Sequence, residues 1–242
     1  MKTGELADRL GKWIKERVDE ADCRGAVFGM SGGIDSSVVA ALCSKALGKD
    51  VLGVIIPCFS IDRDEEHART VAGVFGIPVE KVVLDDLFTA LSSALPDKAV
   101  DDRARRLAAA NLKARLRMLT LYHFANQLRY LVVGSSNRSE LAVGYFTKHG
   151  DSGVDILPLG NLVKREVQEL AGHLGVPQEI IDKPPSAGLW EGQTDEDDLG
   201  FTYNQLDSFL LTGGCEEPLR QRIEGMIAGS RHKCQTPPAP PF

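Results

Sequence analysis

The stretch GAVFGMSGGIDSSVV, from Gly25 to Val39, combines a short apolar run, a turn of small residues and the start of a helix. The apolar residues 26–28 predict a buried strand, and the residues that follow Asp35 favour a helix to Leu47. The glycines at 32 and 33 allow positive φ and a close approach of an anion to the backbone. A strand, a glycine turn and a helix N-terminus in this order form an anion site from backbone N–H groups and the helix dipole. The stretch therefore predicts a phosphate-binding loop.

Asp35 distinguishes this loop from a simple anion site. A carboxylate beside a bound phosphate indicates a cation between them, for which we expect Mg²⁺. Two widespread phosphate loops do not fit, because no Lys follows the glycines as in GxxxxGK[ST] and no GxGxxG stands here. A Gly/Ser turn that binds nothing is the alternative, and the number of matching positions together with the flanking pattern disfavours it.

Apolar runs and helical patterns alternate along the chain. Beyond the first strand, further strands are expected at Val51–Pro57, Val79–Leu84 and Tyr130–Gly134, and a short fifth at Asp155–Leu157. Helices are expected at about 4–21, to Leu47, and at 63–75, 86–95, 101–127, 164–174, 176–182, 203–211 and 218–229. Such alternation predicts an α/β fold with a doubly wound, mostly parallel sheet and helices on both faces. Ligands of such sheets lie at the carboxyl ends of the strands, where Ser31 to Asp35 falls.

The length of 242 residues and a hydrophobic content of 43% predict a single domain, residues 1–242. The segment from Ser186 to Leu199 has the composition of a mobile acidic loop. Residues 231–242 are basic and then Pro-rich, which predicts an extended tail.

The net charge of −6 disfavours a bulk-basic nucleic-acid binder. No apolar run approaches the length of a membrane span, and the N-terminus lacks an apolar signal core. The five cysteines are scattered without a CxxC pair, so neither a disulfide framework nor a zinc site is indicated. We therefore expect a cytoplasmic protein with no nucleic-acid or membrane partner.

A second polar cluster, GSSNRSE from Gly134 to Glu140, follows the strand that begins at Tyr130. Because parallel strands point the same way, this cluster should meet Ser31 to Asp35 at one edge of the sheet. Asp35 and Glu140 then supply two carboxylates for Mg²⁺, with phosphate and water in the remaining positions. Taken alone, a glutamate such as Glu140 is more often a solvent-exposed loop acid, but its place after a strand, in a Ser/Asn-rich turn, favours the metal-binding role.

Several blocks of sequence carry a resemblance to a known family. They are NLKARLRM (111–118), GSSNRSE (134–140), GYFTKHGD (144–151), DILPLGNLVK (155–164), KPPSAGLW (183–190), GQTDEDDLG (192–200) and RHK (231–233). Together with SGGIDSS they resemble the ammonia-dependent NAD synthetases of the PP-loop ATP pyrophosphatase superfamily, in order and over nearly the whole chain. The resemblance implies that the doubly wound sheet is of the Rossmann-like adenine nucleotide alpha-hydrolase type. The resemblance implies that ATP adenylates the carboxylate of nicotinic acid adenine dinucleotide and releases pyrophosphate. Ammonia would then displace AMP to give NAD.

The resemblance also implies roles for individual residues. ATP contacts are implied for Gly29, Met30, Ser31, Gly32, Gly33, Ile34, Asp35 and Ser36, and for Ser135, Lys164 and Ser186. Contacts to the dinucleotide are implied for Arg115, Lys148, Asp155, His232 and Lys233. Asp35 and Glu140 would hold magnesium, the one cofactor besides ATP as co-substrate. Asp35 and Lys164 would act in catalysis, and Asp151 is a candidate for taking a proton from ammonium, because only neutral ammonia is a nucleophile.

Two further expectations concern partners. No glutamine-hydrolysing domain fits in 242 residues, so free ammonia, or ammonia from a separate protein, is implied. The family is dimeric, which implies a homodimer with the acceptor at the interface. The apolar residues Met118, Leu119, Tyr122 and Leu128 of the long helix would suit that interface, but packing into the monomer's own core stays open.

Two alternatives remain. One is another PP-loop ligase that activates a tRNA base or a purine nucleotide, which should show a basic appendage or a catalytic Cys pair. The other is a nucleotide-binding regulatory module without a reaction, which would not need Asp35, Glu140 and Lys164 together.

Overall fold

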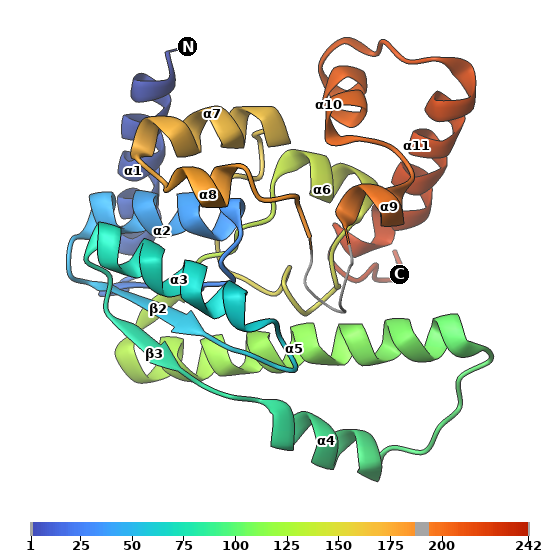
Figure 1. Ribbon diagram of the computed structural model, residues 1–242, viewed down its shortest axis with the longest axis horizontal. Coiled ribbons are helices and arrows are strands. Elements are labelled where there is room, and N and C mark those ends of the chain that lie inside the picture. The colour runs from blue at the N-terminus through green and yellow to red at the C-terminus, as the bar shows by residue number, and fades with distance from the viewer. Residues whose placement is uncertain (1, 187–193, 242) are drawn as a thin grey trace.

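Four parallel strands form the centre of the computed structural model, which describes residues 2–186 and 194–241 (Figure 1). The strands are β1 (Gly25–Gly29), β2 (Val51–Ile55), β3 (Val79–Lys81) and β4 (Tyr130–Val132). Their order in the sheet is β3-β2-β1-β4. The chain therefore moves outward from β1 to β3 and then returns to the other side of β1. This reversal opens the crevice at the carboxyl ends of β1 and β4 in which sheets of this kind bind ligands.

The helices follow the strands in the alternating order that the sequence predicts. They are α1 (Thr3–Glu20), α2 (Ile34–Leu47), α3 (Asp62–Phe75), α4 (Asp85–Ala94), α5 (Asp102–Leu128), α6 (Arg138–Val143), α7 (Lys164–Leu174), α8 (Gln178–Ile181), α9 (Asp195–Leu199), α10 (Tyr203–Thr212) and α11 (Glu217–Ser230). Gly76 adopts a left-handed conformation at the C-terminus of α3, which ends the helix there.

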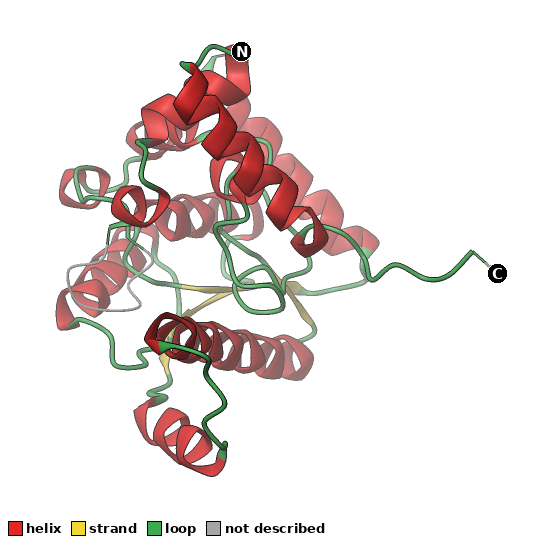
Figure 2. Ribbon diagram, turned by 90° about the vertical axis from the view of Figure 1, so that its right-hand side faces the viewer, coloured by secondary structure: helices red, strands yellow, loops and turns green. Residues whose placement is uncertain are grey.

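Helices cover both faces of the sheet, as Figures 1 and 2 show. On β1, Ala26 and Phe28 belong to the hydrophobic cluster that includes α1, α2 and α7. Val27 points the other way and packs in the cluster that includes α5. This alternation is the period of two expected of a strand covered on both sides. The prediction of a doubly wound α/β fold is confirmed.

A third hydrophobic cluster joins α6, α9, α10 and α11 beside the sheet, at the right of Figure 1. Its buried members are Val143, Leu199, Phe201, Leu206 and Ile223. None of these residues comes from a strand. The cluster therefore holds α9 and α10 against α6, the short helix that follows the carboxyl end of β4.

The structure corrects three local expectations. The expected fifth strand is reduced to a single parallel bridge between Val133 and Ile156. In the expected acidic loop, residues 195–199 form α9, capped by the Thr194 side chain, while residues 187–193 lie outside the described part. The tail begins with a 3-10 helix, Arg231–Lys233, so only the residues after it are extended, and they run away from the rest of the chain (Figure 2).

The apolar residues of α5 were expected to serve either a dimer interface or the monomer's own core, and the structure divides them between buried and exposed positions. Tyr122 packs in the cluster on the α5 side of the sheet. Leu119 is 60% exposed and Leu128 is 38% exposed, so these side chains do not serve the monomer's own core. Met118 is half-buried.

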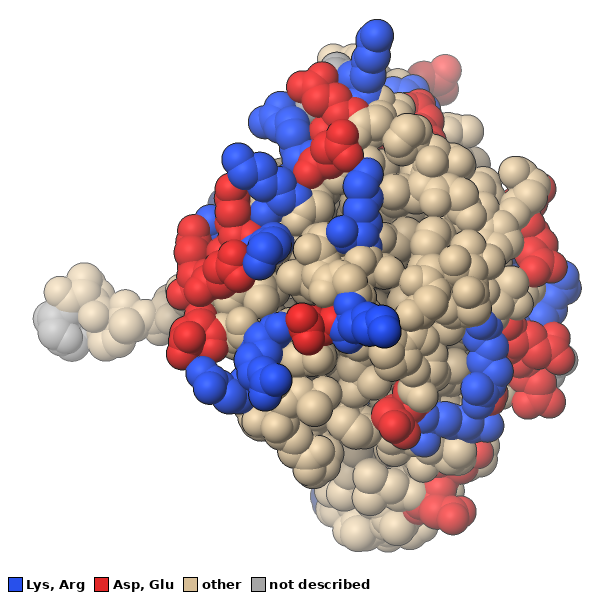
Figure 3. Space-filling view, turned by 90° about the vertical axis from the view of Figure 1, so that its left-hand side faces the viewer, with Lys and Arg blue, Asp and Glu red and all other residues tan. Residues whose placement is uncertain are grey.

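Among the described residues, no helix is both long enough and apolar enough to cross a membrane. Acidic and basic side chains are mixed on the face seen in Figure 3. That face does not present the continuous basic surface by which many proteins bind nucleic acid.

Gly32 provides a test of the loop geometry. Its φ is +73°, and a Cβ there would lie 2.2 Å from the carbonyl oxygen of Asp64 at the start of α3. The positive φ alone costs about 1–2 kcal/mol for other residues. We therefore expect Gly32→Ala to lower the free energy of unfolding by at least about 2 kcal/mol in chemical denaturation. The matched control is Gly33→Ala, because Gly33 has a φ of −93° and its nearest neighbour would be the Ser31 hydroxyl at 3.4 Å. Equal losses in the two variants would contradict the assigned strain.

Candidate active site

The loop between β1 and α2 is held by its own serines. The Gly33 amide donates to Ser31 Oγ at 3.3 Å, and Ser36 Oγ and Ser37 Oγ donate to the Gly33 carbonyl at 2.9 and 2.8 Å. Ser31 Oγ lies 3.0 Å from Ser36 Oγ. Because Ser36 uses its proton on Gly33, Ser31 is the donor in that pair. Among the described residues, no side chain caps the Gly33 end of α2, so the loop keeps the open helix N-terminus that the phosphate-loop prediction requires.

Asn137 joins the ends of β1 and β4. Its side-chain amide donates to Asp35 Oδ1 at 2.9 Å, across 102 residues of sequence. The oxygen of the same amide accepts the backbone N–H of Glu140, and Glu140 Oε2 accepts the backbone N–H of Asn137 at 3.2 Å. This is a capping box at the start of α6. One residue thus fixes both predicted magnesium ligands.

Lys164, the first residue of α7, lies between the two carboxylates. Its Nζ is 2.5 Å from Asp35 Oδ2 and 3.5 Å from Glu140 Oε1. The ammonium also packs over the ring of Tyr203, whose centroid is 4.9 Å away. The Lys164 side chain is only 3% exposed. Three residues that the sequence predicts, Asp35, Glu140 and Lys164, therefore converge at the crevice between β1 and β4.

The charges of this cluster shift one another. Burial raises the pKa of Glu140 from its ordinary 4.5 to about 8; the nearby Asp35 adds to the rise and Lys164 opposes it. Burial alone would lower the pKa of Lys164, but Asp35 and Glu140 outweigh it, so the pKa of the ammonium is raised. Burial also raises the pKa of Asp195. One ammonium thus faces more carboxylates than it can neutralise, and the cluster can accept a further positive charge.

A second group of predicted site residues, called the second group below, lies where residues 144–151 meet the end of α11 and the 3-10 helix Arg231–Lys233. The Arg115 guanidinium donates to the Lys148 carbonyl at 3.3 Å, and Lys148 Nζ donates to the His232 carbonyl at 2.8 Å. Lys233 Nζ donates to the carbonyls of Gly144 at 2.8 Å and Phe146 at 3.0 Å. Arg115, Lys148, His232 and Lys233, all predicted acceptor contacts, are brought together here.

Asp151 belongs to this second group. Its carboxylate accepts the Thr147 N–H at 2.8 Å. Burial lowers the pKa of Lys233, and Asp151 is the main group that opposes this shift. Burial raises the pKa of the Asp151 carboxyl, while the hydrogen bonds it accepts and Lys233 oppose the rise.

Three further predicted site residues, Asp155, Ser135 and Ser186, lie outside both groups of contacting side chains. Asp155 accepts hydrogen bonds from the Tyr122 hydroxyl at 2.9 Å and the Val132 N–H at 2.8 Å, so it fixes the end of β4 rather than joining Arg115. Ser135 is half-buried just after β4. Ser186 is exposed, and the carbonyl of the preceding Pro185 accepts the Asp195 N–H at 3.0 Å.

Sequence reasoning missed four polar residues of the site. The spacing of Asn137 and Glu140 is that of a capping box and could have revealed Asn137. Asp195, Tyr203 and Asp207 come from α9 and α10, and no local pattern marks them. All three are at least 95% buried, and Asp195 Oδ1 has no hydrogen-bond partner among the described residues.

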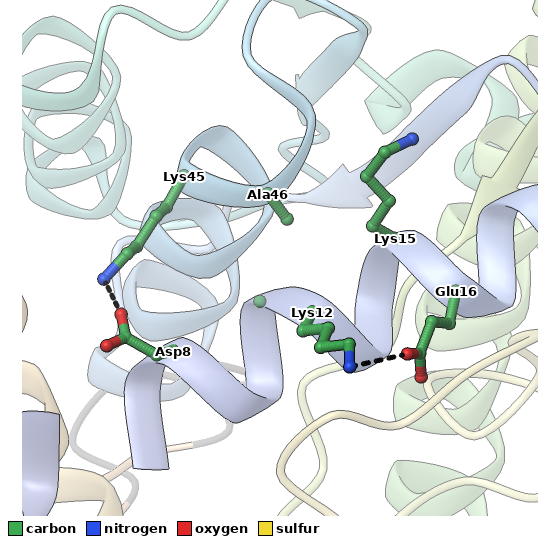
Figure 4. Close-up of a pocket in the computed structure, with 7 residues that line it drawn as sticks. Asp8, Lys12, Lys15, Glu16, Lys45 and Ala46 are labelled. Atoms are coloured by element: carbon green, nitrogen blue, oxygen red, sulfur yellow. Dashed lines mark hydrogen bonds and ion pairs between the residues drawn. The ribbon is translucent and has the colours of Figure 1, made fainter. Parts of the chain in front are cut away.

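A different hollow lies between α1 and α2, shown in Figure 4, with a volume of about 420 Å³. Lys12, Lys15 and Lys45 line it, and they are paired with Glu16, Asp19 and Asp8, respectively. It shares no residue with the phosphate loop, and its charges are already balanced.

The donor set at Asp35 and Glu140 fits Mg²⁺. This ion is usually held by one or two carboxylates together with substrate phosphates and water. Within the described residues, no group of three or more His, Cys, Asp or Glu side chains forms a metal site made of protein alone. The shared approach of both carboxylates to one ammonium shows that their oxygens already converge on a cation.

Known proteins resemble the chain over its whole length. A family model described as NAD synthase matches residues 6–237. The NH(3)-dependent NAD(+) synthetase of Carboxydothermus hydrogenoformans is 49% identical over 236 residues, which cover 98% of this chain and 97% of that protein. The protein of the same name from Methanocaldococcus jannaschii is 46% identical over 253 residues, covering 98% and 96%.

Solved structures share the fold. An NMN synthetase from Francisella tularensis superimposes with a TM-score of 0.92 at 35% identity and covers 100% of both chains. The NH3-dependent NAD synthetase of Campylobacter jejuni, in complex with nitrate, gives a TM-score of 0.81 at 26% identity and covers 99% of both chains.

The raised pKa of Glu140 predicts a pH dependence of stability. Between its ordinary pKa and about 8, the folded protein holds a proton on Glu140 that the unfolded chain releases. The stabilisation is present in full below the ordinary pKa and is lost as pH rises through the folded value. In the presence of a chelator and without nucleotide, we expect the free energy of unfolding of the wild-type protein to fall more steeply from about pH 5 to about pH 8 than that of Glu140→Gln. Parallel profiles from urea denaturation at several pH values would contradict the shift.

Proposed function

Because this chain belongs to the NAD synthase family, we propose that it amidates nicotinic acid adenine dinucleotide to NAD through an adenylated intermediate. The chain is a ligase of the NH3-dependent type. ATP is the co-substrate in this proposal, AMP and pyrophosphate are the by-products, and ammonia is the nitrogen donor. The observation that supports it best is the convergence of Asp35, Glu140 and Lys164 beside the loop at residues 31–36.

The phosphates of ATP would lie on this loop. Its backbone N–H groups and the N-terminus of α2 favour negative charge. Lys164, 3% exposed and directed at Asp35, supplies a fixed positive charge beside the same place. A fixed charge in a water-poor site stabilises a developing negative charge at little cost in reorganisation. Ser135 and Ser186 would add hydroxyl donors.

Magnesium, bound through Asp35 and Glu140, would neutralise phosphate charge and so favour the departure of pyrophosphate. The chain's own contribution is orientation. Asn137 holds Asp35 Oδ1, and the capping box holds Glu140 Oε2. One oxygen of each carboxylate is thereby occupied, and the other faces Lys164.

The acceptor would bind at the second group. The cations of Arg115, Lys148 and Lys233 suit an anionic dinucleotide, and they now donate to backbone carbonyls of the chain itself. His232 lies beside them, and Asp155 would contact the acceptor from the end of β4. Asp151, near Lys233, is the candidate that takes a proton from ammonium before attack.

We also propose that residues 1–242 act as a single catalytic domain and assemble as a homodimer. Exposed leucines on α5, Leu107 at 56% and Leu119 at 60%, offer apolar surface for a second copy. A cytoplasmic location suits the cysteines, all five of which are unpaired.

A second candidate acceptor is the corresponding mononucleotide. The NMN synthetase superimposes with a TM-score of 0.92, above the 0.81 of the C. jejuni NAD synthetase. A site that amidates a nicotinate carboxylate needs the same ATP chemistry for either acceptor. The two differ only in how much of the acceptor the second group contacts.

One assay tests both candidates. The protein is incubated with ATP, Mg²⁺ and ammonium, and with either nicotinic acid adenine dinucleotide or nicotinic acid mononucleotide. We expect amide product, AMP and pyrophosphate in equal amounts, with a higher kcat/KM for the dinucleotide. A higher kcat/KM for the mononucleotide would favour the second candidate, and the absence of all three products with both acceptors would refute the proposal.

Asp35 should be indispensable to this reaction. Asp35→Asn keeps the shape of the side chain but removes the charge that faces Lys164 and the proposed metal. We expect kcat to fall by at least about 100-fold while the circular dichroism spectrum is unchanged. Asp19→Asn is the control, because the Asp19 side chain is 59% exposed and its ion pair with Lys15 contributes little. Magnesium-dependent turnover retained in Asp35→Asn would remove Asp35 from its assigned role.

A further inference from the structure

Helix α10 carries two buried polar side chains one turn apart. Tyr203 is 5% exposed and Asp207 is 1% exposed. Residues four apart lie on one face of a helix, so both point toward the same neighbours. Between them on the buried side lies Leu206, a fully buried member of the third hydrophobic cluster, which holds α10 in place. The helix is therefore a fixed support that presents two polar groups.

Tyr203 contacts the side chains of the active site. Its hydroxyl lies 3.0 Å from Asp195 Oδ2 and 3.4 Å from Glu140 Oε1, and its ring covers the Lys164 ammonium. The hydroxyl carries one proton, so it donates to one of these two carboxylates at a time, and it is within hydrogen-bond distance of both. The ring limits the ammonium to the side where Asp35 and Glu140 lie.

Asp207 contacts the backbone that carries Lys164. Its Oδ1 accepts the Ser139 hydroxyl at 2.5 Å, and its Oδ2 accepts the Arg165 N–H at 2.8 Å. Ser139 Oγ in turn accepts the Lys164 N–H at 3.1 Å. A carboxylate at the N-terminus of α7 is favoured by the helix dipole. Asp207 thus fixes the first turn of α7, directly and through Ser139.

Polar contacts rather than close apolar packing hold this part of the site. A cavity of about 270 Å³ lies between α7 and α10, and Lys164, Tyr203 and Asp207 all line it. A residue beside such a cavity can move unless hydrogen bonds restrain it. In addition to Asp35 and Glu140, which contact the ammonium, α10 restrains Lys164 at both ends, since Asp207 holds its backbone and Tyr203 covers its ammonium.

We propose that Tyr203 and Asp207 are positioning residues of the ligase, which set the Lys164 ammonium and the Glu140 carboxylate relative to Asp35. This inference rests on the proposed function. Neither residue is a catalytic residue, because each acts through Lys164, Glu140 or Ser139. Residues that orient a site in this way typically change activity or metal affinity by about 10–100-fold when substituted.

The test compares four variants in the presence of ATP, Mg²⁺, ammonium and nicotinic acid adenine dinucleotide. Tyr203→Phe keeps the ring over Lys164 and removes the hydroxyl, while Asp207→Asn keeps the shape and removes the charge. Ser139→Ala breaks only the link from Asp207 to the Lys164 N–H. Ser208→Ala changes an exposed residue next to Asp207 and is the control. Measured quantities are kcat, the KM for ATP, the Mg²⁺ concentration at half-maximal activity, and Tm.

We expect kcat to fall about 10-fold or more in Tyr203→Phe and Asp207→Asn and less in Ser139→Ala. The half-maximal Mg²⁺ concentration should rise several-fold in Tyr203→Phe, because Glu140 loses a partner. Ser208→Ala should match the wild type. Where Asp207→Asn does not fold, Ser139→Ala decides the role of Asp207.

Two results separate the inference from the function on which it rests. An active wild type with unchanged kcat and Mg²⁺ dependence in Tyr203→Phe and Ser139→Ala would overturn the positioning role, even if Tm falls. An inactive wild type would overturn the proposed function, and the inference with it.

Discussion

The site depends on one buried ion-pair cluster, in which the Lys164 ammonium meets Asp35 at 2.5 Å and Glu140 at 3.5 Å. Each partner comes from a different part of the fold: Asp35 follows β1, Glu140 follows β4, and Lys164 begins α7. A buried charge without partners would be costly, so this contact favours the folded arrangement in which the three elements lie together. The same contact joins the two sides of the crevice between β1 and β4, where the proposed phosphate chemistry would take place.

Local pattern was sufficient for most of the fold. The glycine turn at 32–33, the apolar strands and the helical spacing of apolar residues predicted the order of elements, because each of these signals depends only on residues close together in the sequence. The end of β4 was less predictable. Asp155–Leu157 has the composition of a strand but makes one bridge, since the Asp155 side chain itself takes the Val132 N–H that a further strand would pair.

The candidate site was predictable only where parallel strands bring motifs together. Topology alone placed Asp35 beside Glu140. Tyr203 and Asp207 could not be found in this way, because they reach Lys164 from a helix that belongs to no strand connection and packs through its own hydrophobic cluster. Their partners lie 63 and 68 residues earlier in the chain, at Glu140 and Ser139.

Lys148 and Lys233 have a consequence beyond their charge. Each ammonium already donates to main-chain oxygens of its own protein, Lys148 to residue 232 and Lys233 to residues 144 and 146. An incoming anion must displace these internal acceptors, and its gain is the difference between a charged partner and a neutral carbonyl. A molecule with too few negative groups would not replace the hydrogen bonds between these lysines and the backbone carbonyls, and the lysines would keep their internal partners. In the proposed reaction, discrimination among acceptors would thus arise from competition with the polypeptide itself, without any group that repels the wrong one.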